Sequence, residues 1–157
     1  MSNHQKFLQH LDSSSESVFI VAKFLYLKGF DVKISGLSKA ERHSDWKKHK
    51  DDGDLFLYHK GKEHRIEVKG LSCDFTGKGD WVFSDFIVCA KHSFDNAIKK
   101  PLAYFILNKD RTHAAIVKSI TKNKWRVVTR SDHRYENVTQ EFYVCPFECI
   151  NWIKLNN

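Results

Sequence analysis

Two short apolar runs joined by a polar turn constrain the fold of this chain more than any other feature of its sequence. The first run is Leu55 to Tyr58, and the second lies within Arg65 to Lys69. The segment between them is polar, with Gly61 near its centre, which is typical of a β-hairpin turn. The sequence therefore predicts two antiparallel strands in this part of the chain.

Polar residues at the open end of this hairpin form a candidate site. Side chains two residues apart share one face of a strand, so Glu67 and Lys69 are expected to stand side by side. In an antiparallel pair the start of the first strand lies beside the end of the second, which brings Asp54 next to them. Two carboxylates suit Mg²⁺, which can polarise a phosphoryl oxygen, and a nearby lysine can position or deprotonate water. These groups predict a site that hydrolyses phosphodiesters.

The spacing of these residues also resembles a known motif. Asp54, twelve intervening residues and then Glu67-Val68-Lys69 are similar to the signature of the PD-(D/E)xK nuclease superfamily, which includes many restriction endonucleases and Holliday-junction resolvases. Gly53 stands where the motif has its proline, a position that varies in the family. The resemblance implies that Asp54 and Glu67 are metal ligands, aided by the Val68 carbonyl, and that Lys69 is the catalytic lysine.

The same resemblance implies further properties of the protein. It implies an Mg²⁺-dependent endonuclease, with Mn²⁺ as an alternative cofactor, for which DNA is favoured over RNA as the substrate and RNA stays open. Many enzymes of the superfamily work as dimers, so a homodimer is one arrangement to consider. Some members add an acidic residue from the helix before the hairpin, and Glu16 would match it. The alternative for Glu16 is a helix cap, because Ser13-Ser-Ser-Glu16 has the form of a capping box.

The chain is basic, with a formal net charge of +7 over 157 residues. A basic surplus attracts polyanions and can supply much of a protein's non-specific affinity for nucleic acid. Two basic segments are therefore predicted to contact phosphates, although solvated charges on loops are the simpler interpretation of each. The residues are Lys39, Arg42, Lys47, Lys48 and Lys50 in the first segment, and Lys122, Lys124 and Arg126 in the second.

Length and composition bound the remaining classes of protein. The length suits one domain, residues 1–157, with a core at roughly 13–108 and further strands and a terminal helix at 109–157. No apolar stretch has the length of a membrane span and no signal peptide is evident, so we expect a soluble intracellular protein, cytoplasmic or nucleoid-associated, with no membrane partner. The four cysteines lack paired zinc-site spacing and are expected to be reduced.

The order of the remaining patterns predicts an α/β fold. A helix is predicted to start at the N-cap Ser13, with apolar residues at helical spacing from Val18 to Tyr26 and Gly29 as its C-terminal cap, and a strand follows at 30–34. After the hairpin we expect a strand at 81–89, a helix at 91–100, strands at 102–107, 114–117 and 125–129, and a helix at 147–155. The predicted architecture is one domain with a central mixed β-sheet flanked by helices, similar to the restriction-endonuclease-like core, and the strands after Pro101 are expected to extend that sheet.

Two other functions remain open from the sequence. One is a nucleic-acid-binding module that keeps this fold without cleaving, which the basic surface favours. The other is a protein–protein adaptor, for which the aromatic residues would supply an interface. A surface hairpin whose glutamate and lysine form an ordinary ion pair is the corresponding alternative for the motif itself.

Overall fold

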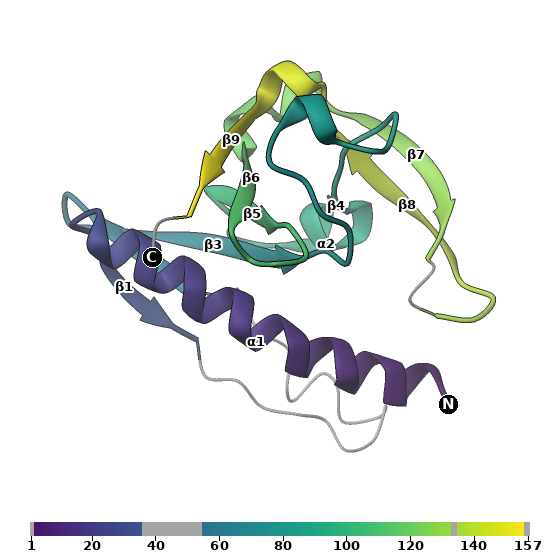
Figure 1. The fold of residues 1–157 in the computed structure, drawn as a ribbon, viewed down its shortest axis with the longest axis horizontal. Helices are drawn as coiled ribbons and strands as arrows, with labels where there is room; N and C mark the ends of the chain where they lie inside the picture. The colour runs from purple at the N-terminus through teal and green to yellow at the C-terminus, as the bar shows by residue number, and fades with distance from the viewer. Residues whose placement is uncertain (1, 36–54, 133–134, 156–157) are drawn as a thin grey trace.

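A long helix and two β-sheets make up the described part of the chain. The computed structural model describes residues 2–35, 55–132 and 135–155. The elements are α1 (Asn3–Leu27), β1 (Asp31–Ile34), β2 (Leu55–His59), β3 (Lys62–Gly70), the 3₁₀ turn η2 (Lys78–Asp80), β4 (Ile87–Ala90), α2 (Lys91–Asn96), β5 (Ala103–Leu107), β6 (His113–Lys118), η3 (Ser119–Lys124), β7 (Arg126–Ser131), β8 (Thr139–Val144), η4 (Phe147–Cys149) and β9 (Ile150–Lys154). Figure 1 shows α1 along one side of the molecule and the pair β7–β8 on another.

The larger sheet is mixed, with strand order β1-β2-β3-β5-β6-β9. Only β3 and β5 pair in parallel, with Glu67 opposite Tyr104 and Lys69 opposite Ile106, whereas the other neighbours are antiparallel. A parallel pair needs a crossover connection, and here residues 71–102 supply it, including β4 and α2. The prediction of a single α/β domain with a mixed sheet is therefore confirmed.

The smaller sheet has the order β4-β8-β7 and is antiparallel throughout. Its inner face meets the larger sheet through Cys89 and Tyr143, which share an apolar cluster with Tyr104 and Ile106 of β5. Aromatic rings also pack between the two sheets: the ring centroids of Tyr104 and Trp125 lie 6.3 Å apart. The core of the protein thus has one layer between the sheets and another between the larger sheet and α1.

The apolar stripe of α1 explains how this helix docks on the sheet. Val18, Val21, Ala22 and Leu25 are buried and recur at helical spacing. They pack in one cluster with buried residues of the hairpin and of β5, namely Leu55, Leu57, Ile66, Val68, Ala103, Phe105 and Leu107. The helix therefore covers the face of β3 opposite to the face that carries Glu67 and Lys69.

The helix ends as the sequence predicts, but it begins earlier. Gly29 has a φ of 93°, and the Phe30 N–H donates to the Leu25 carbonyl, as in a Schellman cap. The N-cap is Ser2, which forms a capping box with Gln5. The predicted start at Ser13 is wrong, because the helix already runs from Asn3 and continues through the polar residues 12–17 into the apolar stripe.

The hairpin of β2 and β3 forms in the predicted place with a tighter turn. Lys60 and Gly61 are its two central residues, with φ values of 51° and 74°. Positive φ at both positions is what a two-residue hairpin turn of the favoured hand requires. The strands are longer than predicted, and their register pairs Leu55 with Ile66.

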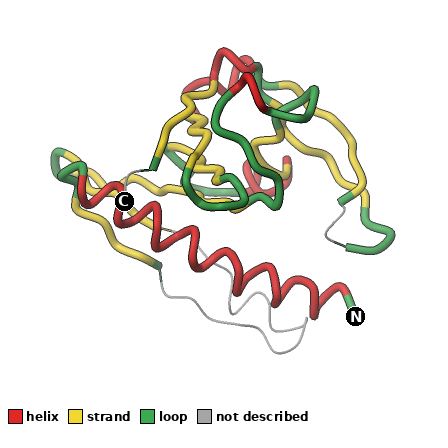
Figure 2. The backbone as a smooth tube through the Cα atoms, viewed as in Figure 1, coloured by secondary structure: helices red, strands yellow, loops and turns green. Residues whose placement is uncertain are grey.

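Three sequence predictions in the second half of the chain are wrong. Residues 147–155 form η4 and β9 rather than a terminal helix, since β-branched and aromatic residues here pair with the exposed edge of β6. Most of 81–89 is loop, and only β4 is a strand; Figure 2 shows how much of the β3–β4 connection is irregular. The strand predicted at 125–129 does not extend the central sheet, because β7 pairs with β8 in the smaller one.

None of the helices in the described part of the chain is long and apolar enough to cross a bilayer.

Candidate functional site

Glu67 and Lys69 lie together on β3, as the sequence predicts. They occupy one face of the strand, opposite Tyr104 and Ile106 of the parallel strand β5. Both side chains are half-buried, whereas Val68 between them is buried against the α1 side. The alternation of side chains along the strand therefore sets a carboxylate and an amine side by side near the C-terminal end of β3.

Arg65 adds a cation to this pair. It stands two residues before Glu67 on the same face, and its Nη2 donates to Glu67 Oε1 in an ion pair. The two side chains are only 16% and 25% exposed, so water screens this pair less than a surface pair. Arg65 Nη1 also donates to the Lys99 carbonyl at 3.2 Å. The guanidinium thus fixes one oxygen of the candidate metal ligand.

The charges of the site also affect the pKa values of two further groups on this face. Burial raises the pKa of Cys89 to about 11, with Glu67 adding to the rise, while the Tyr104 hydrogen bond and Lys69 oppose it. Burial also raises the pKa of the Tyr104 phenol, with smaller contributions from Cys89 and Glu67. Cys89 and Tyr104 therefore stay protonated near neutral pH and line the site as neutral groups.

The third predicted residue of the site, Asp54, lies outside the described residues. The strand β2 begins at the next position, Leu55, whose partner across the hairpin is Ile66, the neighbour of Glu67. Among the residues that the structure describes, no three His, Cys, Asp or Glu side chains gather into a metal-binding group. The described part of the site is thus Glu67 with its cationic neighbours.

Glu16 lies in the interior of α1 and its side chain is exposed. The interpretation of Glu16 as a cap of its own helix is wrong, because the helix begins at Asn3. Its neighbour Ser17, in contrast, is fully buried against the end of β3. A role for Glu16 at the metal stays a prediction.

The end of β3 is crowded by an arginine that the sequence did not single out. Arg111 has a φ of 61° in the β5–β6 turn, and its Nη1 donates to the carbonyls of Leu71 and Asn108 at 2.8 and 2.6 Å. A Cβ at Gly70 would lie 2.5 Å from its Nη2, so glycine is required for this approach. Arg111 therefore crowds the α1 side of β3, the face opposite to the one that carries Glu67 and Lys69.

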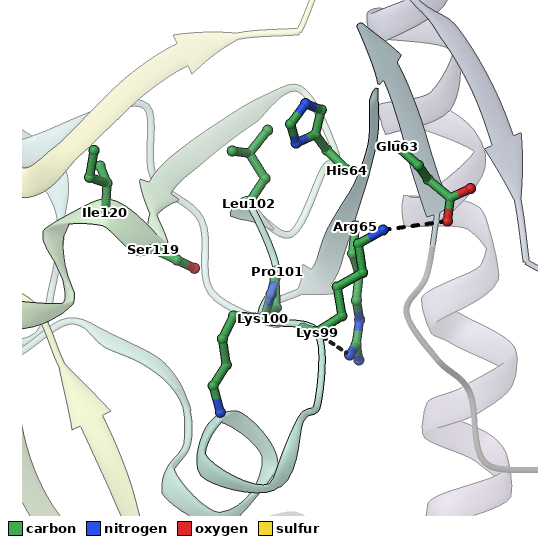
Figure 3. A pocket seen from close by; sticks show the side chains of 9 residues that line it. All are labelled: Glu63, His64, Arg65, Lys99, Lys100, Pro101, Leu102, Ser119 and Ile120. Carbon is green, nitrogen blue, oxygen red and sulfur yellow. Dashed lines mark hydrogen bonds and ion pairs between the residues drawn. The ribbon is translucent and has the colours of Figure 1, made fainter. Parts of the chain in front are cut away.

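A hollow of about 230 Å³ opens at the opposite end of β3, next to Arg65 (Figure 3). Its lining includes four basic residues, two of which are lysines. Protein oxygen atoms interact with the ammonium groups of both lysines. Lys99 Nζ lies 3.7 Å from Glu63 Oε1, and Lys100 Nζ donates to the Asp95 carbonyl at 3.0 Å. The hollow therefore offers little uncommitted charge, and it meets the site only through Arg65.

The basic residues that were predicted to bind nucleic acid differ in whether the structure describes them and in how exposed they are. Lys39, Arg42, Lys47, Lys48 and Lys50 lie outside the described residues. Lys122 is half-buried, with its Nζ 4.3 Å from the ring centroid of Tyr143, while Lys124 is exposed. Arg126 forms an ion pair with Asp85. Of the three residues of the second segment, only Lys124 and Arg126 are therefore exposed enough to contact a large partner.

Sequence reasoning missed Arg65 and Tyr104. Arg65 had a local signal, because strand period places it on the same face as Glu67. Tyr104 had none, since its position depends on the parallel pairing of β5 with β3 across a long crossover.

Comparison with known proteins gives no relative. No family model matches the chain, and neither a curated protein nor a solved structure is significantly similar to it. The class that the structure itself defines is a single α/β domain with a mixed sheet, and Glu67 and Lys69 lie on its parallel pair of strands.

Proposed function

We propose that this protein is a metal-dependent nuclease of the PD-(D/E)xK type that hydrolyses phosphodiester bonds in DNA. The observation that carries the proposal is the position of Glu67 and Lys69, side by side on one face of β3 at the open end of the hairpin. Continuing the register of the hairpin by one residue beyond Leu55 and Ile66 would set Asp54 opposite Glu67, the pairing that the proposal requires.

The topology supports the same proposal. A helix precedes three antiparallel strands, the third strand carries Glu67 and Lys69, and a crossover containing α2 leads to a parallel strand. This order agrees with the helix, central sheet and following helix that the resemblance implies. We therefore propose a restriction-endonuclease-like core, to which β6 and β9 add strands and the smaller sheet adds a second layer.

The donor set fits a hard divalent cation. Asp54 and Glu67 would hold Mg²⁺ or Mn²⁺ through carboxylate oxygens, together with the Val68 carbonyl. When bound, such an ion polarises a phosphoryl oxygen and lowers the pKa of a coordinated water. Arg65 already engages one Glu67 oxygen, so a metal would use the other oxygen or displace the guanidinium.

Lys69 supplies the chemistry that belongs to the protein itself. Its amine stands on the same face as the carboxylate, at the next position of the strand's period. There it would orient the attacking water or stabilise the charge that develops on the phosphate. The neutral phenol and thiol behind the site leave this charge balance to Arg65, Glu67 and Lys69.

The experiment that tests the proposal is a cleavage assay on supercoiled plasmid, a four-way junction, single-stranded DNA and RNA, each with Mg²⁺, Mn²⁺ or EDTA. We expect metal-dependent cutting that Lys69→Ala and Glu67→Gln reduce by at least about 100-fold, in line with the loss of a general acid–base group. Lys62→Ala and Glu63→Gln are matched controls, because both lie exposed at the other end of β3.

Cutting by wild type that survives in Lys69→Ala at the level of the Lys62→Ala control would refute the assignment. A folded-state check, such as the urea midpoint of each variant, separates lost chemistry from lost structure.

One observation favours a second function, a nucleic-acid-binding module without cleavage. The ion pair of Arg65 with Glu67 neutralises a carboxylate that a metal would need. If this pair blocks the metal, Arg65→Met should bind Mn²⁺ in calorimetry while wild type does not. Binding of nucleic acid by wild type without cutting in any metal would then favour the module.

A further inference from the structure

Asp85 of the β3–β4 loop binds an arginine pair on β7, and the same loop carries an exposed aromatic ring. Arg126 and Arg130 lie on one face of β7, on either side of Val128. Both donate to Asp85 of the loop, Arg126 to Oδ1 and Arg130 to Oδ2, the latter at 2.9 Å. A single carboxylate therefore gathers two guanidinium groups that strand geometry alone would hold far apart.

The charge of this cluster is not balanced. Two guanidinium groups share one carboxylate, which leaves a net positive charge that solvent reaches. The arginine side chains are 59% and 50% exposed, whereas that of Asp85 is 24% exposed. Glu141 pairs with Thr129 and so lies on the other face of the β7–β8 pair. Each arginine retains N–H donors that a phosphate oxygen would accept.

The loop that supplies Asp85 also carries an exposed aromatic residue, two positions before it. Phe83 is 57% exposed, and Val82 next to it is 67% exposed. The Phe83 ring lies edge-on against Trp81, with centroids 5.5 Å apart. Trp81 in turn donates its indole N–H to the Asp85 carbonyl at 3.1 Å. The ring and the arginine pair are thus fixed by the same short loop.

Water contact with an apolar ring is unfavourable, so a partner that covered Phe83 and the exposed Val82 beside it would gain free energy. The partner here must also be anionic to suit the arginines. Single-stranded nucleic acid meets both conditions, because its phosphates bind guanidinium groups and its unpaired bases stack on aromatic rings. Duplex DNA meets only the first condition, since its bases are already stacked.

The geometry points to a binding surface for single-stranded nucleic acid formed by Phe83, Arg126 and Arg130, with Asp85 and Trp81 as positioning residues. The inference rests on the proposed function for the class of its ligand, but not on the residues proposed for cleavage. It gives the smaller sheet a role as the element that receives an unpaired strand.

Binding without cleavage tests this surface. Fluorescence anisotropy would measure the affinity of the full chain, in EDTA, for an oligothymidylate of about 16 nucleotides, the upper site size of comparable surfaces. We expect Phe83→Ala to weaken binding about tenfold and Phe83→Trp to restore it, because one stacked base contributes about that much. Duplex affinity should not change in Phe83→Ala.

The contribution of the arginines would be seen in the salt dependence of binding. Arg126→Gln with Arg130→Gln should lower the slope of log K against log salt by about 1.4, since each phosphate contact to a single strand contributes about 0.7. Lys62→Gln with Lys154→Gln removes the same charge from exposed positions of the larger sheet and should leave Phe83-dependent binding intact. Ile98→Ala is the apolar control, because Ile98 is fully exposed in the turn after α2.

Several results would overturn the inference. Phe83→Ala and the arginine variant could bind oligothymidylate as tightly as the Lys62 and Ile98 controls, or polyglutamate could bind equally well with the same dependence on Phe83. Neither result bears on cleavage by Lys69. Conversely, loss of single-strand binding in Phe83→Ala would stand even if Lys69→Ala proved to cut normally, so the two proposals fail separately.

Discussion

The end of β3 leaves no room for a side chain at Gly70. A Cβ there would lie 2.5 Å from Arg111 Nη2 and 2.7 Å from Ser17 Oγ, closer than real Cβ contacts. Arg111 can swing aside only by giving up its bonds to two carbonyls, and Ser17 is fixed on the buried face of α1. This glycine therefore sets how closely the helix α1 and the β5–β6 turn approach the end of β3.

We expect Gly70→Ala to lower the free energy of unfolding by about 1–3 kcal/mol, the usual range for forcing an extra methyl group into packed structure. Urea denaturation would measure it. Gly77→Ala is the matched control, because nothing lies within 4 Å of a Cβ at Gly77. Its change should stay within about 0.5 kcal/mol. Equal losses in both variants would contradict the close approach at Gly70.

The part of the candidate site that depends on the two-residue periodicity of a single strand could be predicted from the sequence. Glu67 and Lys69 share a face because they are two residues apart on a strand, and the apolar run on the opposite face identified that strand. The arginine partner Arg65 obeys the same rule but was overlooked, since a charged residue near a turn suggests solvent. Tyr104 and Arg111 could not be predicted, because long-range strand pairing and a positive φ bring them to β3.

Elements with strong periodicity were also predictable. The Gly29 cap and the apolar stripe of α1 identified the helix, and the Gly61 turn identified the hairpin. The terminal segment at 147–155 was misread as a helix because Phe147, Ile150 and Ile153 happen to recur every three residues. Its actual state depends on the edge of β6, which needs a partner strand and which no local pattern reveals.

The stripe of α1 supports a matched test of how the helix docks. Leu25 is 6% exposed in the cluster under the helix, whereas Leu27 is 58% exposed two residues later. Leu25→Ala should destabilise the fold by about 2–5 kcal/mol through lost burial and a cavity. Leu27→Ala should change stability by no more than about 0.5 kcal/mol, as at other surface positions. Thermal or urea unfolding would compare them, and similar losses would mean that α1 docks by another face.

The two sheets are joined by buried groups that keep their protons. Cys89 of β4 and Tyr104 of β5 form a hydrogen bond across the layer between the sheets, and burial raises the pKa of both. For Cys89 the rise is from 9.0 to about 11. Directly after β8, burial raises the pKa of Cys145 to about 12. The contact between the sheets therefore depends on these thiols and the phenol staying neutral.

This dependence predicts how stability changes at high pH. A group whose pKa is raised by folding holds its proton in the folded state after the unfolded chain has lost it, so stability declines as pH rises. The decline should begin near pH 9 and approach about 1.4 kcal/mol per pH unit for each such group between its unfolded and folded pKa. Urea unfolding measured from about pH 7 to 11 would follow it.

Cys89→Ala removes one of these groups and should make the decline above pH 9 shallower, whatever its effect near neutrality. Val88→Ala is the control, because Val88 is also buried, in the neighbouring position of β4, and carries no proton to lose. It should lower stability by the same amount at every pH and leave the slope unchanged. The difference between slopes, rather than between midpoints, isolates the thiol, since a cavity costs the same whether or not neighbouring groups titrate. Parallel pH profiles for wild type and Cys89→Ala would mean that the thiol stays in contact with solvent and that other groups control the junction of the sheets.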